Sequence, residues 1–435
     1  MRTERVFGFL KPQVALSEWD GEVRTLPLPD RVRVPLSRPG RVPLRPVVTV
    51  GEKVKSGQPL ASTLSGTAVH APITGEVIRI GPLHTPDGLQ IQGIDILRGE
   101  TEDWMSFQPI EDAEGASVDD LMNTAHSLGF PAPWKPEVLG EGGLSSGPLP
   151  IRTIAVIAVD REPGLSVQRR YLTERREELI GALGPLQRMA GDIRLVLLVP
   201  RSLANEARGT FSGIDVQEVP ERYPENHWRL VLARLAGKGN LTIPGARGQG
   251  ILLLTAENVA LAGRALREGR PRTTKLITVS GKGMAEPVTV EAVIGTPISH
   301  VFEELGIQVE ENDRIILGGI WRGHAQFDLQ APITRATDGL TINPASEVVH
   351  LEEAPCIHCG RCVRACPVRI QVGIVARLGE FGFGEDCYQA GAHACIECGL
   401  CAYVCPAKRP LVQYMRFGKS CHEKKEAEEA AAAVE

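Results

Sequence analysis

The ten cysteines of this 435-residue chain all lie between residues 356 and 421. Eight of them form two runs with the same spacing, C-x-x-C-x-x-C-x-x-x-C-P. The first run is Cys356, Cys359, Cys362 and Cys366, and the second is Cys395, Cys398, Cys401 and Cys405. So much crowding in so long a chain does not fit a disulfide scaffold, and it indicates metal ligation in a reducing compartment.

This spacing predicts two [4Fe–4S] clusters, because three cysteines at steps of three wrap one cubane while the fourth, followed by proline, faces the other. We therefore expect crosswise ligation. One cluster is expected on Cys356, Cys359, Cys362 and Cys405, and the other on Cys395, Cys398, Cys401 and Cys366. Zinc is the alternative metal, but a zinc site with only cysteine ligands needs two cysteine pairs rather than two triplets with an isolated Cys-Pro. Cys387 and Cys421 are expected to be buried or idle thiols rather than ligands of a third metal site.

Charge and hydropathy exclude two classes of partner. The net charge of −5 and the pI near 6.1 argue against nucleic-acid binding. No uncharged apolar stretch approaches the roughly 20 residues of a membrane-spanning helix, and the first residues lack the pattern of a secretory signal. We expect a protein without a direct membrane span, either soluble or peripheral to a membrane.

The pattern of strands, helices and turns predicts a multidomain α/β plus β fold. Residues 1–100 resemble a barrel-sandwich hybrid, although no lysine stands in the hairpin motif of a swinging-arm carrier. Strands alternate with helices in 101–274, which predicts a Rossmann-like α/β layer with a helix over Ser166–Leu183. Residues 275–348 look like an SLBB-type β-grasp module, 349–420 form the ferredoxin-like domain, and 421–435 are a charged tail, of which Glu423 to Glu435 are expected to be frayed or disordered.

This order of units resembles the RnfC family, a component of the Rnf-type ion-translocating oxidoreductase complex, from about Pro27 to Lys419. Local matches occur in the same order, among them Val50-Gly51-Glu52-Lys53-Val54, Gly129-Phe130-Pro131, Gly295-Thr296-Pro297 and Cys405-Pro406-Ala407-Lys408. The resemblance implies a peripheral electron-transfer subunit on the cytoplasmic face of the cell membrane. Its partners would be the other subunits of the complex and a redox donor protein. It would be a component of a translocase rather than an independent catalyst.

In that family the α/β layer binds FMN and accepts electrons from NADH, and its flavin loop reads Gly-Gly-Ala-Gly-Phe-Pro with a lysine four residues later. Here the second half of the loop survives as Gly129, Phe130 and Pro131, followed by Lys135, whereas His126 and Ser127 replace the first two glycines. Glycines matter in such a loop because backbone without Cβ can lie against a phosphate or a ring.

Three further departures from the family pattern agree. Arg161 adds a bulky cation beside the retained Glu162, and Trp228 stands in a motif that reads Tyr-Pro-x-Gly-x-Glu-Lys in the family. Thr255 takes the place of an expected asparagine, although Asn258 leaves that register open. The sequence therefore predicts a degenerate flavin and NADH site with no bound FMN. The alternative is a repositioned flavin, in which case the chain is an FMN-dependent NADH:acceptor oxidoreductase component.

Overall fold

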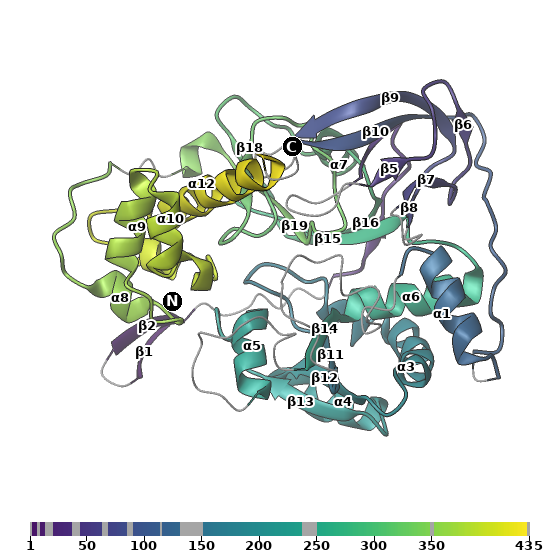
Figure 1. The fold of residues 1–435 in the computed structure, drawn as a ribbon, viewed down its shortest axis with the longest axis horizontal. Helices are drawn as coiled ribbons and strands as arrows, with labels where there is room; N and C mark the ends of the chain where they lie inside the picture. The colour runs from purple at the N-terminus through teal and green to yellow at the C-terminus, as the bar shows by residue number, and fades with distance from the viewer. Residues whose placement is uncertain are drawn as a thin grey trace.

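The computed structural model describes residues 2–6, 9–13, 21–36, 44–62, 68–84, 90–113, 115–130, 151–236, 250–348 and 352–432. Within these residues the chain forms a small β unit, a parallel sheet with helices, a mixed sheet and a helical C-terminal part (Figure 1).

The small β unit consists of two sheets that share one core. One sheet has the strand order β4-β10-β9-β6 and the other β5-β7-β8. The strands are β4 (Arg31–Pro35), β5 (Arg45–Pro46), β6 (Lys53–Val54), β7 (Pro59–Ser62), β8 (Ala68–His70), β9 (Gly75–His84) and β10 (Gln90–Arg98). Val32, Leu60 and Ile94 from different strands are all 0% exposed in this core. Apolar side chains alternate with more exposed ones along β4, as the sequence pattern predicts for a half-buried strand.

The described N-terminal segments reach other parts of the molecule. β1 (Arg2–Val6) and β2 (Phe9–Gln13) form an antiparallel hairpin, and β2 lies beside α8 (Arg361–Ala365) of the C-terminal part (Figure 1). β3 (Arg24–Thr25) pairs in parallel with β16 (Val288–Val293) of the mixed sheet. The beginning of the chain therefore joins the C-terminal part and the mixed sheet rather than the small β unit alone.

A four-stranded parallel sheet with order β13-β12-β11-β14 forms the second part. Its strands are β11 (Thr153–Ile157), β12 (Arg194–Pro200), β13 (Asp215–Val219) and β14 (Ile251–Thr255). The helices around it are α1 (Val118–Ser127), α3 (Arg176–Ala190), α4 (Ala204–Thr210), α5 (Trp228–Leu235) and α6 (Ala256–Glu268).

Helices cover both faces of this sheet, and the side chains of β11 show it. Ile154 and Val156 pack in the core that includes α3, α4 and α6. Ala155 and Ile157 point the other way, into the core that includes α5. A strand buried on both faces reads as a continuous apolar run, which is why this segment could be predicted as a parallel strand.

The helix predicted over Ser166–Leu183 begins about ten residues later than expected. A short 3-10 turn, Arg169–Tyr171, precedes α3. The buried carboxylate of Asp160 accepts the backbone N–H groups of Val167 and Gln168 at 2.7 and 2.8 Å. These hydrogen bonds, seven and eight positions apart in the chain, hold the segment as a loop, and the helical periodicity of the segment does not signal them.

The third part is a six-stranded mixed sheet with order β18-β17-β19-β15-β16-β3. Its strands after β3 are β15 (Thr274–Ser280), β16, β17 (Arg314–Leu317), β18 (His324–Gln326) and β19 (Gly339–Asn343). β15 pairs antiparallel with β16 and parallel with β19. Helix α7 (Ile298–Glu304) packs on this sheet through Ile298, Val301 and Phe302.

The C-terminal part is helical and contains all ten cysteines. Its helices are α8, α9 (Val372–Glu380), α10 (Gly384–Gln389), α11 (Leu400–Tyr403) and α12 (Leu411–Ala432). They surround a core that includes Val375, Cys387 and Met415, each 0% exposed. Cys387 donates from its thiol to the Val375 carbonyl at 3.4 Å, which fits the packing role expected for it.

The expectation of a frayed segment from Glu423 onward is wrong for the residues that the structure describes, because α12 continues to Ala432. His422 is only 5% exposed and its ring stacks on Tyr388 at 4.0 Å. A Cβ on Gly384 would meet Cys421 at 2.9 Å, so the two helices touch there. The tail composition suggested nothing to bury, but these two residues at its start dock α12 on α10, and the helix continues from that anchor.

No helix among the residues that the structure describes is long and apolar enough to cross a membrane.

Candidate iron–sulfur cluster sites

The two cysteine runs adopt the same backbone conformation. Three pairs of equivalent residues have positive φ, namely His358 and Glu397 at 52° and 55°, Gly360 and Gly399 at 69° and 78°, and Arg369 and Lys408 at 57° and 53°. Residues other than glycine rarely adopt this region, because Cβ approaches the backbone. Because positive φ recurs at three matched positions, the two cysteine runs share one loop conformation.

This backbone turns N–H groups toward the sulfurs. Glu397 N–H donates to Cys395 Sγ at 3.4 Å. Burial raises the pKa of Cys366, and N–H groups of the residues after it, Val368 and Arg369, oppose that rise. N–H groups that face thiolates stabilise their negative charge and tune the potential of a cluster that they hold.

The first group of thiols mixes the two runs. Burial raises the pKa of Cys362, and the charges of Cys405 and Cys356 raise it further. Cys405 of the second run therefore lies beside Cys356 and Cys362 of the first. Cys359 stands in the same loop, where its carbonyl accepts a hydrogen bond from Arg364 Nη2 at 3.0 Å.

The second group of thiols also mixes the two runs, with one cysteine of the first run among three of the second. Burial is the main cause of the raised pKa of Cys395, and Cys366 of the first run contributes through its charge. Burial is also the main cause of the raised pKa values of Cys398 and Cys401, and the charges of Cys395 and Cys366 raise them further. The structure thus places Cys405 near Cys356 and Cys362, and Cys366 near Cys395, Cys398 and Cys401. The two full ligand sets stay a prediction from the sequence spacing.

The second group is covered by the rest of the chain. Cys398 and Cys401 are each 7% exposed, and burial raises the pKa of Cys398 to about 12. Tyr223, from the loop before α5, donates from its hydroxyl to the Cys398 carbonyl at 2.7 Å. Trp321, from the mixed sheet, lies so close that a Cβ on Gly399 would be 3.2 Å from its ring. A metal that binds here must displace the thiol protons, and the resulting thiolates then compensate its positive charge in a buried site.

Cations of α12 lie against the second loop. Lys419 Nζ donates to the Cys395 carbonyl at 3.0 Å and to Glu397 at 2.6 Å, and Arg416 bonds Glu397 at 2.9 Å. Burial opposes ionisation of Glu397, but Lys419 and Arg416 lower its pKa to about 2. This arrangement fixes the loop to α12 and places positive charge beside a group of thiolates.

Among the residues that the structure describes, no three His, Cys, Asp or Glu side chains form a group that could hold one metal ion. The preference for iron–sulfur clusters over zinc therefore rests on the spacing of the cysteines.

The residues of the predicted flavin loop lie at the end of α1. His126 and Ser127 form the last turn of this helix. The N–H groups of Leu128, Gly129 and Phe130 donate within the same turn, at 2.8 to 3.0 Å, to the carbonyls of residues 124 to 126. Pro131 and Lys135 lie outside the described residues. The backbone donors that a flavin phosphate would need at these positions are used by the helix.

Glu162 lies elsewhere, at the carboxyl end of β11 against the mixed sheet. It is 3% exposed, and its carboxylate accepts the N–H groups of Trp321 and Arg322 at 2.7 and 3.3 Å. Burial raises its pKa, and the Trp321 N–H opposes that rise. A Cβ on Gly319 would lie 1.9 Å from the Glu162 carboxyl carbon, so there is no room between the two parts. The Glu162 carboxylate therefore contacts the loop before β18.

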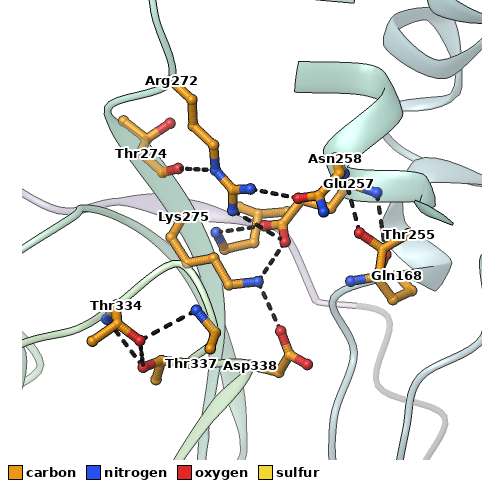
Figure 2. Close-up of polar contacts among 12 residues, drawn as sticks. Gln168, Thr255, Glu257, Asn258, Arg272, Thr274, Lys275, Thr334, Thr337 and Asp338 are labelled. Carbon is orange, nitrogen blue, oxygen red and sulfur yellow. Dashed lines mark hydrogen bonds and ion pairs between the residues drawn. The ribbon is translucent and has the colours of Figure 1, made fainter. Parts of the chain in front are cut away.

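An ion network joins β15 to the start of α6, which follows β14 (Figure 2). Lys275 on β15 is 0% exposed and donates to Glu257 and, at 2.8 Å, to Asp338. Arg272 also pairs with Glu257, at 3.3 Å, and Arg161 pairs with Asp338 at 3.1 Å. Burial opposes ionisation of Asp338, but Arg161 and Lys275 lower its pKa to about 2.

The polar residues around this network are also engaged. Thr255 caps α6 by accepting the Asn258 N–H at 3.2 Å, and the Asn258 side chain accepts a hydrogen bond from Arg272 at 2.6 Å. Asn226, in the Tyr-Pro motif, donates to the Asp160 carbonyl. Ligands of open α/β sheets bind outside the carboxyl ends of the strands. Here the chain's own side chains take up that edge.

Comparison with known proteins agrees with the cysteine pattern and with the small β unit. The family described as "4Fe-4S dicluster domain" matches residues 355–409, and "RnfC Barrel sandwich hybrid domain" matches residues 13–100. The RnfC component of the ion-translocating oxidoreductase complex of Rhodobacter capsulatus is 30% identical over 92% of this chain and 79% of that protein. This chain belongs to the RnfC family of ion-translocating oxidoreductase complexes.

Other members extend the comparison. The RnfC protein of Pseudomonas aeruginosa is 30% identical over 92% of this chain, which spans only 53% of that longer protein. The Clostridium ljungdahlii relative is named as part of a proton-translocating ferredoxin:NAD(+) oxidoreductase complex, and it is 27% identical over 92% of this chain and 89% of its own length. A crystal structure of an NAD+-reducing [NiFe]-hydrogenase aligns over 65% of this chain and 53% of the hydrogenase chain. The TM-score is 0.41 and the sequence identity is 15%, so the similarity is remote.

Proposed function

We propose that this chain is a peripheral electron-transfer subunit of a membrane-bound, ion-translocating oxidoreductase complex. The single observation that carries the proposal is the doubled cysteine loop, whose sulfurs fall into two groups that each mix the two runs. The names of the relatives support the complex, and the family match over residues 355–409 supports iron–sulfur chemistry. The partners are the other subunits of the complex and a redox donor protein, and the place is the cytoplasmic face of the membrane.

In this proposal two [4Fe–4S] clusters supply one-electron chemistry when bound. Cys356, Cys359, Cys362 and Cys405 hold one, and Cys395, Cys398, Cys401 and Cys366 hold the other. The protein fixes the thiolates by the positive-φ loops and directs backbone N–H groups at them. Lys419 and Arg416 add positive charge beside the second site. That charge should favour the reduced, more negative form of the cluster held there.

The same proposal names the units of the fold. Residues 101–274 form a Rossmann-like α/β domain, for which the strand order β13-β12-β11-β14 is the support. Residues 275–348 form an SLBB-type β-grasp module, and 349–420 form the two-cluster domain. Residues 421–432 are the end of α12 rather than a separate tail.

We further propose that the α/β domain binds neither FMN nor NADH and serves as a platform for the other parts. The N–H groups at the end of α1 are used within the helix, and the ion network around Lys275 takes up the sheet edge. A flavin placed there would leave polar groups unpaired at about 1–3 kcal/mol each. Two such losses weaken binding by roughly a hundredfold or more, since about 1.4 kcal/mol is a factor of ten. Glu162 is then a structural acceptor for backbone N–H groups.

The experiment for the peripheral role is a wash of membranes that carry the assembled complex. High salt or carbonate without detergent should release the chain, and the released protein should contain about eight irons, the number that two cubanes require. A need for detergent contradicts peripheral attachment. Released protein with four irons or fewer contradicts a two-cluster relay.

A further inference from the structure

Three aromatic side chains form a row beside the second cysteine loop. The ring centroids of Tyr223 and Trp321 are 5.3 Å apart, and those of Trp321 and Tyr403 are 5.6 Å apart. These separations are those of rings in contact. A Cβ on Gly399 would lie 3.2 Å from the Trp321 ring, so the middle member of the row also touches the loop itself.

The aromatic row leads from the interior to the surface. Tyr223 is 2% exposed, Trp321 is partly buried and Tyr403 is 49% exposed. Tyr403 ends α11 two residues after Cys401, so its ring reaches solvent while it stays in contact with Trp321. The row therefore connects a buried group of thiols with the surface through consecutive ring contacts.

The first cysteine loop differs at the matching positions. Arg364 and Tyr403 each lie two residues after the third cysteine of their run, so an arginine stands where the second loop has its exposed ring. Among the described residues, a Cβ on Gly360 would meet only the Arg364 side chain within 4 Å, whereas one on Gly399 would meet Trp321. Because the two loops share one backbone conformation, the loop itself does not require the aromatic row.

The chemistry of these side chains gives the row a use. Tryptophan and tyrosine lose one electron readily, whereas phenylalanine does not. Hydrogen peroxide that meets reduced iron takes one electron and leaves a hydroxyl radical, which attacks the groups nearest to it. At a cysteine such attack leads up the oxidation ladder to sulfinic and sulfonic acids, which are not reversed by thiols. A neighbouring ring that reacts first spares the thiolate.

Resting on the proposed function, we propose that Trp321 and Tyr403 form a radical relay that carries an oxidising equivalent from the second cluster site to the surface. Hydrogen peroxide takes one electron from the reduced cluster and one proton from solvent, which gives water and a hydroxyl radical. The hydroxyl radical takes a hydrogen atom from Trp321 and becomes water. The tryptophan radical takes a hydrogen atom from the Tyr403 hydroxyl. A soluble thiol returns a hydrogen atom to the tyrosyl radical, and two thiyl radicals join as a disulfide.

The surroundings of the row set the direction of the relay. The Glu162 carboxylate accepts the backbone N–H of Trp321 at 2.7 Å, and negative charge so close stabilises an electron-deficient indole. The Tyr223 hydroxyl donates to the Cys398 carbonyl, and a carbonyl cannot take up the phenol proton when the ring is oxidised. Oxidation of Tyr223 is therefore disfavoured, and the radical passes from Trp321 to Tyr403.

Pulse radiolysis of the anaerobically purified full chain with azide radicals tests the transfer between the rings. Azide radicals oxidise tryptophan, and tryptophan and tyrosyl radicals absorb at different wavelengths. In the wild type, decay of the tryptophan signal should match growth of the tyrosyl signal in a phase that does not depend on protein concentration. Trp321→Phe and Tyr403→Phe each keep a ring in place, and each should abolish this phase.

Tyr388→Phe is the matched control for these variants. Tyr388 belongs to the same C-terminal part, but its ring contacts His393 and His422 instead of the aromatic row. The control should keep the concentration-independent phase of the wild type. A wild type without this phase, or Phe variants of the row that keep it, overturns the relay.

Hydrogen peroxide added to the reduced, cluster-loaded chain tests where the oxidising equivalent goes. Peptide mass spectrometry should find oxidation at Tyr403 in the wild type and a shift of oxidation to Cys395, Cys398 and Cys401 in Trp321→Phe. An added thiol should suppress the damage in the wild type and not in Trp321→Phe. The first-loop peptide that carries Cys356 should be oxidised equally in both proteins, which makes it an internal control.

The two experiments separate this inference from the proposed function. Full iron content, with equal oxidation of the second-loop cysteines in the wild type and in Trp321→Phe, overturns the relay and leaves the electron-transfer role intact. A wild-type chain without iron contradicts the proposed function, and the azide measurement then still decides whether the radical passes from Trp321 to Tyr403.

Discussion

Replacement of Lys275 by methionine should destabilise the protein, because it removes the central cation of a buried network of ion pairs. The side chain is 0% exposed, and its Nζ contacts carboxylates of Glu257 and Asp338. Methionine keeps most of the volume of the lysine stem and removes the charge. Loss of one member of a buried pair usually costs about 3–5 kcal/mol, because the partner stays buried and uncompensated.

The structure places the expected cost near the lower limit. Glu257 retains Arg272 at 3.3 Å, and Asp338 retains Arg161 at 3.1 Å, so each carboxylate keeps one cation. We therefore expect a loss of about 3 kcal/mol in the free energy of unfolding. For a unit of roughly 200 residues this corresponds to a fall in Tm of about 6–12 °C.

Urea and thermal unfolding of the anaerobically purified protein at neutral pH would measure this loss. Lys282→Met is the matched control, since Lys282 lies just after β15 but its side chain is 71% exposed, with Glu347 at 3.7 Å. That change should cost about 1 kcal/mol or less. If Lys275→Met were as stable as Lys282→Met, the ion network would not hold the parallel sheet against the mixed sheet.

Three further outcomes are expected. Cys366→Ala should abolish the EPR signal of the cluster on Cys395, Cys398 and Cys401, although Cys366 belongs to the other run. Cys387→Ala should leave the signals of both clusters unchanged. Loss of the first-run cluster in Cys366→Ala would refute crosswise ligation. Trp321→Ala should speed the release of iron from the second site to a chelator, and Ile320→Ala, at a neighbouring residue that is 53% exposed, should not. The pKa of Asp338 is lowered from 3.8 to about 2. This shift contributes roughly 2 kcal/mol to the free energy of unfolding above pH 4, and the contribution is lost as the pH falls through 2. Acid unfolding of Asp338→Asn should therefore lack that part of the pH dependence.

The cysteine loops could be predicted from sequence because their information is local. Three cysteines at steps of three and a Cys-Pro predict which thiols turn inward. The matched positive φ values of His358 and Glu397 are consistent with one loop conformation in both runs. β11 could be predicted for a similar reason, since a run of five apolar or small residues has few alternatives in an α/β pattern.

The cover of the second loop and the ion network could not be predicted, because they join residues far apart in the chain. Tyr223 and Cys398 are separated by 175 positions, and Lys275 and Asp338 by 63. One signal was present, a lysine inside the apolar strand β15, and such a residue must find a buried partner. The sequence does not say which carboxylate that partner is. The tail was misjudged because a charged, Ala-rich segment can be a helix once its first turn docks, as His422 does on Tyr388.

Titration of the cluster-loaded protein with FMN tests whether electrons pass through two [4Fe–4S] clusters in a chain that binds neither flavin nor NADH. Tight, stoichiometric uptake of FMN should not occur, and NADH added afterwards should leave the cluster absorbance unbleached while a chemical reductant bleaches it. Stoichiometric FMN binding followed by reduction of the clusters with NADH would contradict the account and identify the α/β domain as a working NADH-oxidising site.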